Sequence, residues 1–246
     1  GGCVGDGSVI VLSQVSAFSI YPHIYSKLPY QAKDFEPISI GAIMHHGLAV
    51  GPAVPAEVKT LKDFLAWSKN NPDKASFGSP GAGTQPHLIG ALLSLRSGVK
   101  LSHVPYRGTA PAVSDLAGGQ IAAVMGPSGD FLSYYKAGKL RVLATSGQQR
   151  NPYLPHVPTL EEQGLSDLIT EAAFGFYRHT TTPADVRQRA HAAITAALKS
   201  DALKDSVGVV GLIATSSTPE EMARSQQAEF DRWGPLVKQI GFTADS

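Results

Sequence analysis

The sequence contains one cysteine, Cys3, in 246 residues. A single cysteine excludes an intrachain disulfide and leaves a thiolate metal site without enough ligands. No apolar run reaches the roughly 18 residues that a membrane-spanning helix needs. Residues 1–6 show neither the basic nor the apolar part of a secretion signal. We therefore expect a fold that is held together by its core, without a disulfide or a metal ion.

An excess of charge of either sign is also lacking. Lysine and arginine number 21 and aspartate and glutamate 20, which leaves a formal net charge of +1. Nucleic-acid-binding proteins usually carry a basic face or a strongly basic total. We therefore expect no nucleic-acid partner. The length is enough for one large domain or two small lobes.

Short β-branched runs alternate with helical patterns along most of the chain. Strands are predicted at residues 8–13, 38–43, 48–50, 75–78, 101–104, 121–125 and 140–145. Helices are predicted at residues 60–70, 84–97, 110–117, 131–135, 183–200 and 219–240. The continuous apolar run at 8–13 is typical of a strand buried on both faces of a parallel sheet. The alternation predicts an α/β fold with parallel sheets and helices on both sides, which binds ligands at the carboxyl ends of its strands.

The sharpest local feature is a glycine turn between a predicted strand and a predicted helix. It comprises Ser79, Pro80, Gly81, Ala82, Gly83 and Thr84. Such a turn directs backbone N–H groups and the positive end of a helix toward one point, which suits a carboxylate or a phosphate. The alternative is a tight connection in which Thr84 caps its own helix.

Motifs for catalysis do not fit the sequence. The dinucleotide fingerprint would need a glycine at Pro86, and residues 126–130 (GPSGD) place the second glycine one position too early for a nucleophile elbow. His45 and His46 are neighbours on an extended stretch, so their side chains point to opposite faces and form a poor metal site. His87, one turn into its helix, is expected to pack or to bond to a loop. We expect no enzyme activity, no catalytic residue and no cofactor.

Six motifs, in order and at consistent spacing, resemble one family over residues 6–241. They are Leu28-Pro29-Tyr30 with Lys33-Asp34-Phe35, the glycine turn with His87-Leu88, residues 103–112 (HVPYRGTAPA), 116–120 (LAGGQ), 136–141 (KAGKLR) and 154–159 (LPHVPT). This series is similar to the extracytoplasmic solute receptors of tripartite tricarboxylate transporters. The resemblance implies a periplasmic protein that captures a small carboxylate and delivers it to integral membrane transporter subunits.

The resemblance also implies a two-lobed α/β periplasmic binding protein of the type II Venus-flytrap class. Residues 1–48 and 173–246 are then expected to form lobe one, and residues 49–172 lobe two. Relatives carry a further strand, helix and pocket loop before the segment that matches Asp6-Gly7, so lobe one is expected to be incomplete at its N-terminus. We expect such a chain to bind ligand weakly or to self-associate through lobe one.

Family members hold the ligand carboxylate between two facing loops, and the lobe-two loop matches the glycine turn. The predicted ligand-binding residues are Ser79, Gly81, Ala82, Gly83, Thr84, His87, Tyr21, Tyr106 and Phe174. The three aromatic residues are candidates for a pocket wall, with ordinary core packing as the alternative for each. Many relatives have an acidic or polar residue where this chain has Gly126. The loss of that partner for an ammonium group makes an amino-acid ligand less expected.

Three alternatives belong to other classes. The effector-binding domain of a regulator shares the two-lobed architecture but should follow a DNA-binding domain. A hydrolase would need a nucleophile, a base and an oxyanion site, and no such set can be assembled from the sequence. A remnant that no longer binds ligand is the third alternative.

Overall fold

The structure of the chain, a computed structural model, describes residues 9–244. Cys3, the Asp6-Gly7 match and the first residue of the predicted strand at 8–13 lie outside the described residues. The chain divides into two compact units: unit one runs up to Ile43 and resumes at Ala172, and unit two comprises Met44–Glu171. The assignment of these units to two lobes that close on a ligand stays a prediction.

The sheet of unit one has the strand order β1-β7-β2-β8. Strand β1 (Val11–Gln14) pairs antiparallel with β7 (Glu171–His179), and β8 (Ile213–Ala214) pairs antiparallel with β2 (Phe35–Val50). The prediction of a first strand buried on both faces is wrong. Side chains of β1 alternate between half-buried and exposed, and Leu12 is 59% exposed, because β1 is the end strand of this order and only one of its faces packs on the core.

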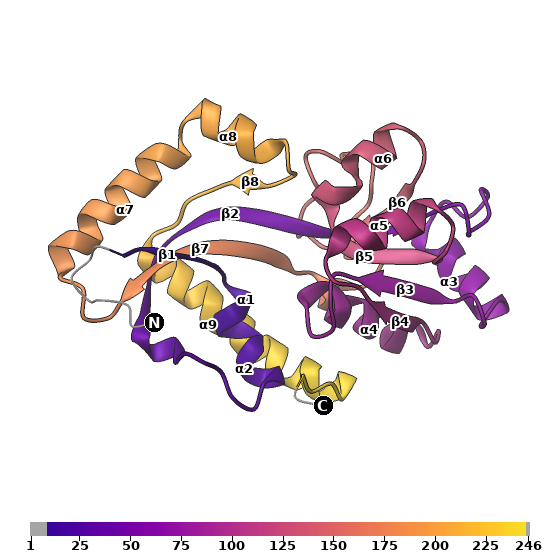
Figure 1. Cartoon of the computed structure of the whole chain (residues 1–246), viewed down its shortest axis with the longest axis horizontal. Helices are drawn as coiled ribbons and strands as arrows, with labels where there is room; N and C mark the ends of the chain where they lie inside the picture. Colours follow the sequence, from indigo (N-terminus) through magenta and orange to yellow (C-terminus); the bar gives the residue numbers. More distant parts are fainter. Residues whose placement is uncertain (1–8, 245–246) are drawn as a thin grey trace. The chain divides into compact units, whose positions relative to one another are not determined.

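Unit one also contains helices. They are α1 (Ser16–Ser19), α2 (Tyr21–Ile24), the 3₁₀ turn η1 (Ala32–Asp34), α7 (Ala184–Leu198), α8 (Asp201–Gly208) and α9 (Pro219–Ile240). Both α1 and α2 pack against α9 (Figure 1). Helix α9 has its predicted bounds because Thr218 and Glu221 form a reciprocal capping box at its start. Its buried Met222 joins Val15, Phe18 and Tyr177 in the core of the unit.

The sheet of unit two is mixed. Its strands are the end of β2 with β3 (Ser76–Ser79), β4 (Ser102–Pro105), β5 (Ala123–Pro127) and β6 (Arg141–Thr145), in the order β6-β2-β5-β3-β4. Strand β3 is parallel to β4 and to β5, as predicted. The prediction of parallel pairing is wrong for β2, which is antiparallel to both β5 and β6. The predicted strands 38–43 and 48–50 are parts of this single long strand.

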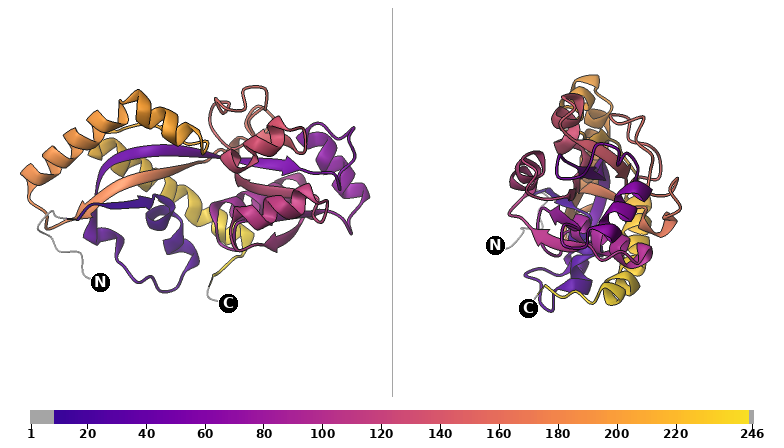
Figure 2. Two further views of the ribbon diagram at one scale, coloured as in Figure 1. Left: turned by 45° about the horizontal axis from the view of Figure 1, so that its top comes forward. Right: turned by 90° about the vertical axis from the view of Figure 1, so that its right-hand side faces the viewer.

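Helices pack on both sides of the parallel strands. Unit two contains α3 (Leu61–Asn70), α4 (Gln85–Ser97), α5 (Thr109–Ala117), η2 (Ser128–Phe131), α6 (Leu132–Lys136) and η3 (Ser166–Leu168). Helix α4 contacts β3, β4 and β5, and α5 contacts β3 and β5; Figure 2 gives two further views. Helix α3 begins at a capping box, in which Thr60 accepts a hydrogen bond from the Asp63 amide.

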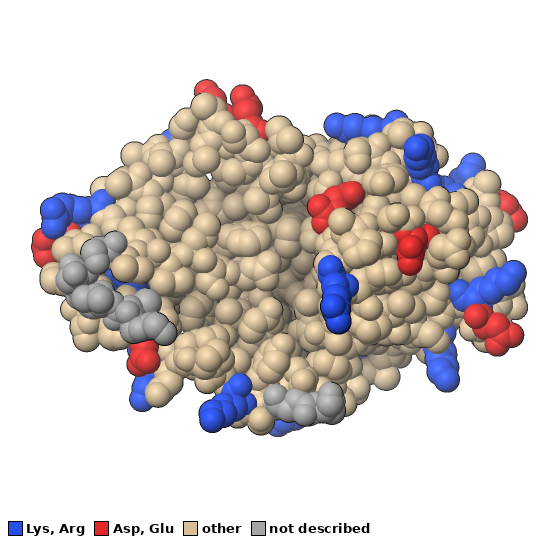
Figure 3. Space-filling model, in the orientation of Figure 1, with Lys and Arg blue, Asp and Glu red and all other residues tan. Residues whose placement is uncertain are grey.

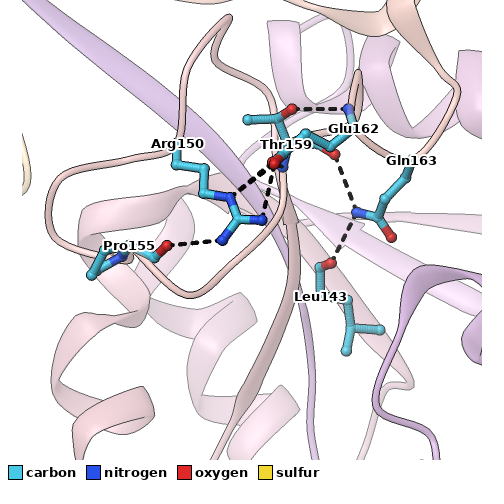
Figure 4. Close-up of polar contacts among 6 residues, drawn as sticks. All are labelled: Leu143, Arg150, Pro155, Thr159, Glu162 and Gln163. Carbon is cyan, nitrogen blue, oxygen red and sulfur yellow. Dashed lines mark hydrogen bonds and ion pairs between the residues drawn. The ribbon is translucent and has the colours of Figure 1, made fainter.

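The motif at residues 154–159 has a structural role in the loop after β6. Arg150 donates from Nε to both carboxylate oxygens of Glu162, at 3.0 Å each, and from Nη1 to the Pro155 carbonyl at 3.2 Å (Figure 4). The Glu162 carboxylate also accepts the Thr159 amide at 2.7 Å, and the Thr159 hydroxyl accepts the Glu162 amide at 3.1 Å. These contacts close the loop upon itself.

Surface charge and hydropathy agree with the composition. Between residues 9 and 244, no helix combines the length and the apolar character required to cross a membrane. On the face shown in Figure 3, basic and acidic side chains of the described residues are interspersed and form no continuous patch of one sign.

Candidate ligand-binding site

The glycine turn lies where the sequence predicts it, between β3, which ends at Ser79, and α4, which begins at Gln85. Ser79 is fully buried, whereas Ala82 is exposed at the tip. Gly83 has a φ of +77°, a left-handed backbone conformation that strongly favours glycine. The prediction of a glycine-dependent turn is confirmed at this residue.

The carbonyl of Gly81 is the centre of the turn. It accepts hydrogen bonds from the Ser79 hydroxyl at 3.0 Å, from the Thr84 hydroxyl at 2.7 Å and from the Thr84 amide at 3.4 Å. Thr84 stands at the N-cap position of α4, but its side chain makes no capping hydrogen bond. The alternative in which Thr84 caps its own helix is therefore wrong for the side chain, which stabilises the turn instead.

Most of the amides at residues 81–84 already have acceptors within unit two. The Gly81 amide donates to the Ser79 hydroxyl at 3.4 Å, and the Gly83 amide donates to Nδ1 of His87 at 3.1 Å. The amide of Ala82 has no acceptor in the part of the chain that the structure describes. Ala82 is itself an exposed residue, unlike Ser79 and Gly83, which are buried.

Two stacked histidines lie behind the turn. The rings of His87 (α4) and His103 (β4) have centroids 3.9 Å apart and an interplanar angle of 24°. Nε2 of His103 lies 2.8 Å from the Ser79 hydroxyl, whose single proton is directed at Gly81, so His103 donates this hydrogen bond. Burial lowers the pKa of His87, and burial followed by the charge of His87 lowers the pKa of His103 to about 4. Both rings are neutral at neutral pH.

A serine hydroxyl 2.8 Å from an imidazole is also the geometry of a nucleophile and its base. Ser79 is 0% exposed, however, and its proton is used in the turn. The other neighbours of His103 are the rings of Phe77 and His87. A substrate could not reach this hydroxyl, so the pair serves the turn. Across residues 9–244, no three histidine, cysteine or acidic side chains gather where they could hold a metal ion.

Tyr106 packs against the hydrophobic core of unit two. Its ring lies so close to Gly78 that a Cβ atom there would be 2.9 Å from Cε2 of the ring. Its hydroxyl donates to Asp115 of α5 at 2.9 Å. Burial first, and then the bond to Asp115, raises the pKa of Tyr106 to about 12.

The other two aromatic candidates belong to unit one. Tyr21 is the first residue of α2, and its ring faces that of Tyr25 edge-on at 5.5 Å. Phe174 lies on β7 opposite Gln14. Both side chains are half-buried. The structure thus brings Ser79, the residues of the turn, His87 and Tyr106 together in unit two and places Tyr21 and Phe174 in unit one.

A buried polar network at the start of α4 was not predicted. His46 donates from Nε2 to Gln85 at 2.9 Å, and Gln85 donates to the Thr170 hydroxyl at 2.7 Å. The Ser146 hydroxyl donates to the Thr170 carbonyl at 2.7 Å and accepts the His46 amide at 3.0 Å. Burial lowers the pKa of His46 to about 4, although the bond to Gln85 opposes the shift. This network fixes the first residue of α4 behind the turn.

His45 and His46 have different partners, as their positions on an extended stretch imply. Nε2 of His45 lies 3.3 Å from the Glu171 carboxylate, and this bond lowers the pKa of Glu171. The ring of His45 covers Gly147, where a Cβ atom would lie 2.3 Å from Cε1. The two histidines therefore stabilise separate parts of unit two.

Gly126 occupies a closely packed position on β5. A Cβ atom there would lie 3.2 Å from Cγ2 of Thr109 and 3.5 Å from the ring of Phe131. The glycine faces Gly47 of β2 across the sheet. An acidic side chain at this position would require its neighbours to move.

Comparison with known proteins gives a consistent result. The family model for tripartite tricarboxylate transporter family receptors matches residues 3–242. A UPF0065 protein from the tcbD-tcbE intergenic region of Pseudomonas sp. strain P51 is 31% identical over 242 residues, which are 98% of this chain and 71% of that protein. A UPF0065 protein from the gbd 5′ region of Cupriavidus necator is 32% identical over 209 residues, 83% of this chain and 62% of that protein.

Solved structures agree with this assignment. A structure described as a periplasmic transporter is 32% identical, with a TM-score of 0.86, and the match covers 98% of this chain and 80% of that chain. R. palustris Rpa4515, solved with adipate, is 26% identical with a TM-score of 0.86 and the same coverage. The mixed α/β fold of periplasmic binding proteins is thereby confirmed. The chain belongs to the receptor family of the tripartite tricarboxylate transporters, as its motifs predict.

Proposed function

We propose that this chain is a periplasmic receptor that captures a small carboxylate and delivers it, chemically unchanged, to the membrane subunits of a tripartite tricarboxylate-type transporter. Membership of the receptor family supports this role. The relative that was solved with adipate supports a carboxylate as the ligand class.

The glycine turn carries the proposal. The exposed residue Ala82, whose amide has no acceptor among the described residues, lies in the turn that leads into α4, a helix of 13 residues. The start of a helix concentrates partial positive charge, and a free backbone N–H group beside it is a good donor to a carboxylate oxygen. We propose that Ala82 donates to the ligand while Ser79, Gly81, Gly83, Thr84 and His87 shape the turn around it.

We propose that this turn recognises a carboxylate through backbone N–H groups and the helix end, without a charged side chain. Residues 79–87 include no lysine or arginine. A carboxylate bound here is held by hydrogen bonds and a helix end, so geometry is expected to select the ligand more than net charge does. Gly126 offers no acid to an α-ammonium group, and Thr109 and Phe131 pack against it. We therefore propose a carboxylate without an α-ammonium group as the ligand.

Titration of the ¹⁵N-labelled chain with adipate tests the site. We expect saturable shifts of the Ala82 amide and of the amides next to it in the turn. The same titration of Gly83→Ala, which strains the turn, should give weaker binding. Saturable binding with no change at residues 79–84 would refute the proposed site, and no binding of any small carboxylate would refute the function.

A further inference from the structure

We propose that His87, backed by His103, is a positioning residue that holds the glycine turn closed, and that protonation of this pair releases the turn and weakens ligand binding in acid. The effect on binding rests on the function proposed above. The release of the turn itself does not depend on that function.

The contact between His87 and Gly83 has one donor and one acceptor. The Gly83 amide donates to Nδ1 of His87 at 3.1 Å, so Nδ1 must present a lone pair. Gly83 has a φ of +77°, a left-handed conformation that strongly favours glycine. His87 is only 7% exposed and projects from the first turn of α4, which Gln85 anchors to His46 and Thr170. The acceptor is therefore held in place from behind.

His103 holds the other end of the turn. It donates to the Ser79 hydroxyl, which in turn donates to Gly81, and its ring stacks on that of His87 at 3.9 Å. The two imidazoles thus connect strand β4 to both ends of the turn. A change in either ring is transmitted to the other by direct contact.

Protonation of His87 removes the acceptor for the Gly83 amide. A second proton on His87 occupies Nδ1, so two N–H groups then face each other across 3.1 Å where one hydrogen bond had been. If His103 is also charged, two cations are stacked at 3.9 Å. Either change favours a turn in which Gly83 has moved away from His87.

Besides His87, the described groups of unit two that flank His103 are an aromatic ring and a hydroxyl. Phe77 of β3 flanks His103 at 5.0 Å, and Ser79 is neutral. Tyr106, on the loop after β4, directs its hydroxyl to Asp115. The pKa of His103 is lowered by burial and by His87, and that of His87 by burial. The closed turn is therefore favoured at neutral pH and is lost as the pH falls below the ordinary range of histidine.

Two conservative substitutions separate titration from structure. His87→Asn keeps an oxygen acceptor near the Nδ1 position but takes up no proton. His103→Gln keeps an amide donor near the Nε2 position and likewise does not titrate. The double variant should retain the closed turn at every pH at which the chain is folded.

The test combines two measurements between pH 7.5 and pH 4, because the pKa of His103 is lowered to about 4. In the wild-type chain, the Gly83 amide shift should follow the titration of the His87 ring, and adipate should bind about tenfold more weakly at the lower pH, a change of about 1.4 kcal/mol. The double variant should show neither change beyond the effect of adipate's own protonation, which both proteins share. A Gly83 amide that does not respond while His87 titrates overturns the proposal, as does an equal loss of affinity in both proteins. Adipate could fail to bind even at pH 7.5 while the Gly83 amide shift still follows the titration of the His87 ring. That result would refute the proposed ligand but not the release of the turn by protonation of His87.

Discussion

Gly83 donates its amide hydrogen to Nδ1 of His87, 3.1 Å away, while its own backbone has a φ of +77°. A side chain at residue 83 would strain that backbone conformation, and the strain would pull on the hydrogen bond to α4. Gly81, two residues earlier, does not have a positive φ, and a Cβ atom there would meet its neighbours at ordinary distances of 3.4 Å or more. The two glycines form a matched pair for mutagenesis.

Gly83→Ala should destabilise the chain by about 1–2 kcal/mol, the cost of a left-handed conformation for a residue with a Cβ atom. Gly81→Ala should be close to neutral. Urea unfolding of both variants beside the wild type measures the difference. Equal stabilities for the two variants would show that the conformation of Gly83 is not a constraint.

Thr60→Ala should destabilise the chain by about 1 kcal/mol, because it removes one half of the capping box at the start of α3. Thr60→Ser keeps the hydroxyl that accepts the Asp63 amide at 3.1 Å and should be nearly neutral. Thermal unfolding of the two variants is the measurement. A serine variant as unstable as the alanine variant would mean that the methyl group, and not the cap, is responsible.

Local signals predicted much of the secondary structure. Helices α3 and α9 lie within one residue of their predicted bounds, and each begins at a capping box whose two residues are three positions apart. The direction of strand pairing was less predictable. Strands β2 and β5 are far apart in the sequence, and no local pattern shows that they pair antiparallel. The predicted strands at residues 38–43 and 48–50 leave out residues 44–47, which belong to β2 in the structure. In the structure, Gly41 leaves room for the ring of Phe176, which no local pattern reveals.

The same limit applies to the candidate site. The glycine turn could be recognised because its residues are consecutive. The residues that hold the turn in place could not be recognised, because the pairs that contact each other are far apart in the sequence. His103 follows Ser79 by 24 residues, and Gln85 follows His46 by 39. Thr84 stands at a position that fits a cap, but its hydroxyl donates to the Gly81 carbonyl at 2.7 Å instead. Contacts of this kind depend on tertiary packing.

Stability should fall in acid because of His46. Its pKa is lowered from an ordinary 6.5 to about 4 by burial, so the unfolded chain binds the proton more tightly than the folded chain does. The stabilisation is therefore present above about pH 6.5 and is lost as the pH falls toward 4. For this fully buried ring the loss amounts to about 3 kcal/mol.

Urea unfolding at several values between pH 7.5 and pH 4 checks this expectation. His46→Gln keeps a donor for Gln85 but does not titrate, so its stability should decline less steeply over the same range. His156 is exposed, and His156→Gln is the matched control with a wild-type slope. Parallel slopes for the wild type and His46→Gln would exclude His46 as the source of acid sensitivity.

The central claim is that this chain binds a small carboxylate without an α-ammonium group, and titration calorimetry at pH 7.5 tests it most directly. Adipate and succinate would be compared with glutamate and aspartate, using the same protein preparation. We predict saturable binding of the dicarboxylates that is tighter than binding of either amino acid, because Gly126 provides no acid to pair with the ammonium group. Tighter binding of glutamate or aspartate, or no heat of binding from any of the four, would contradict the account.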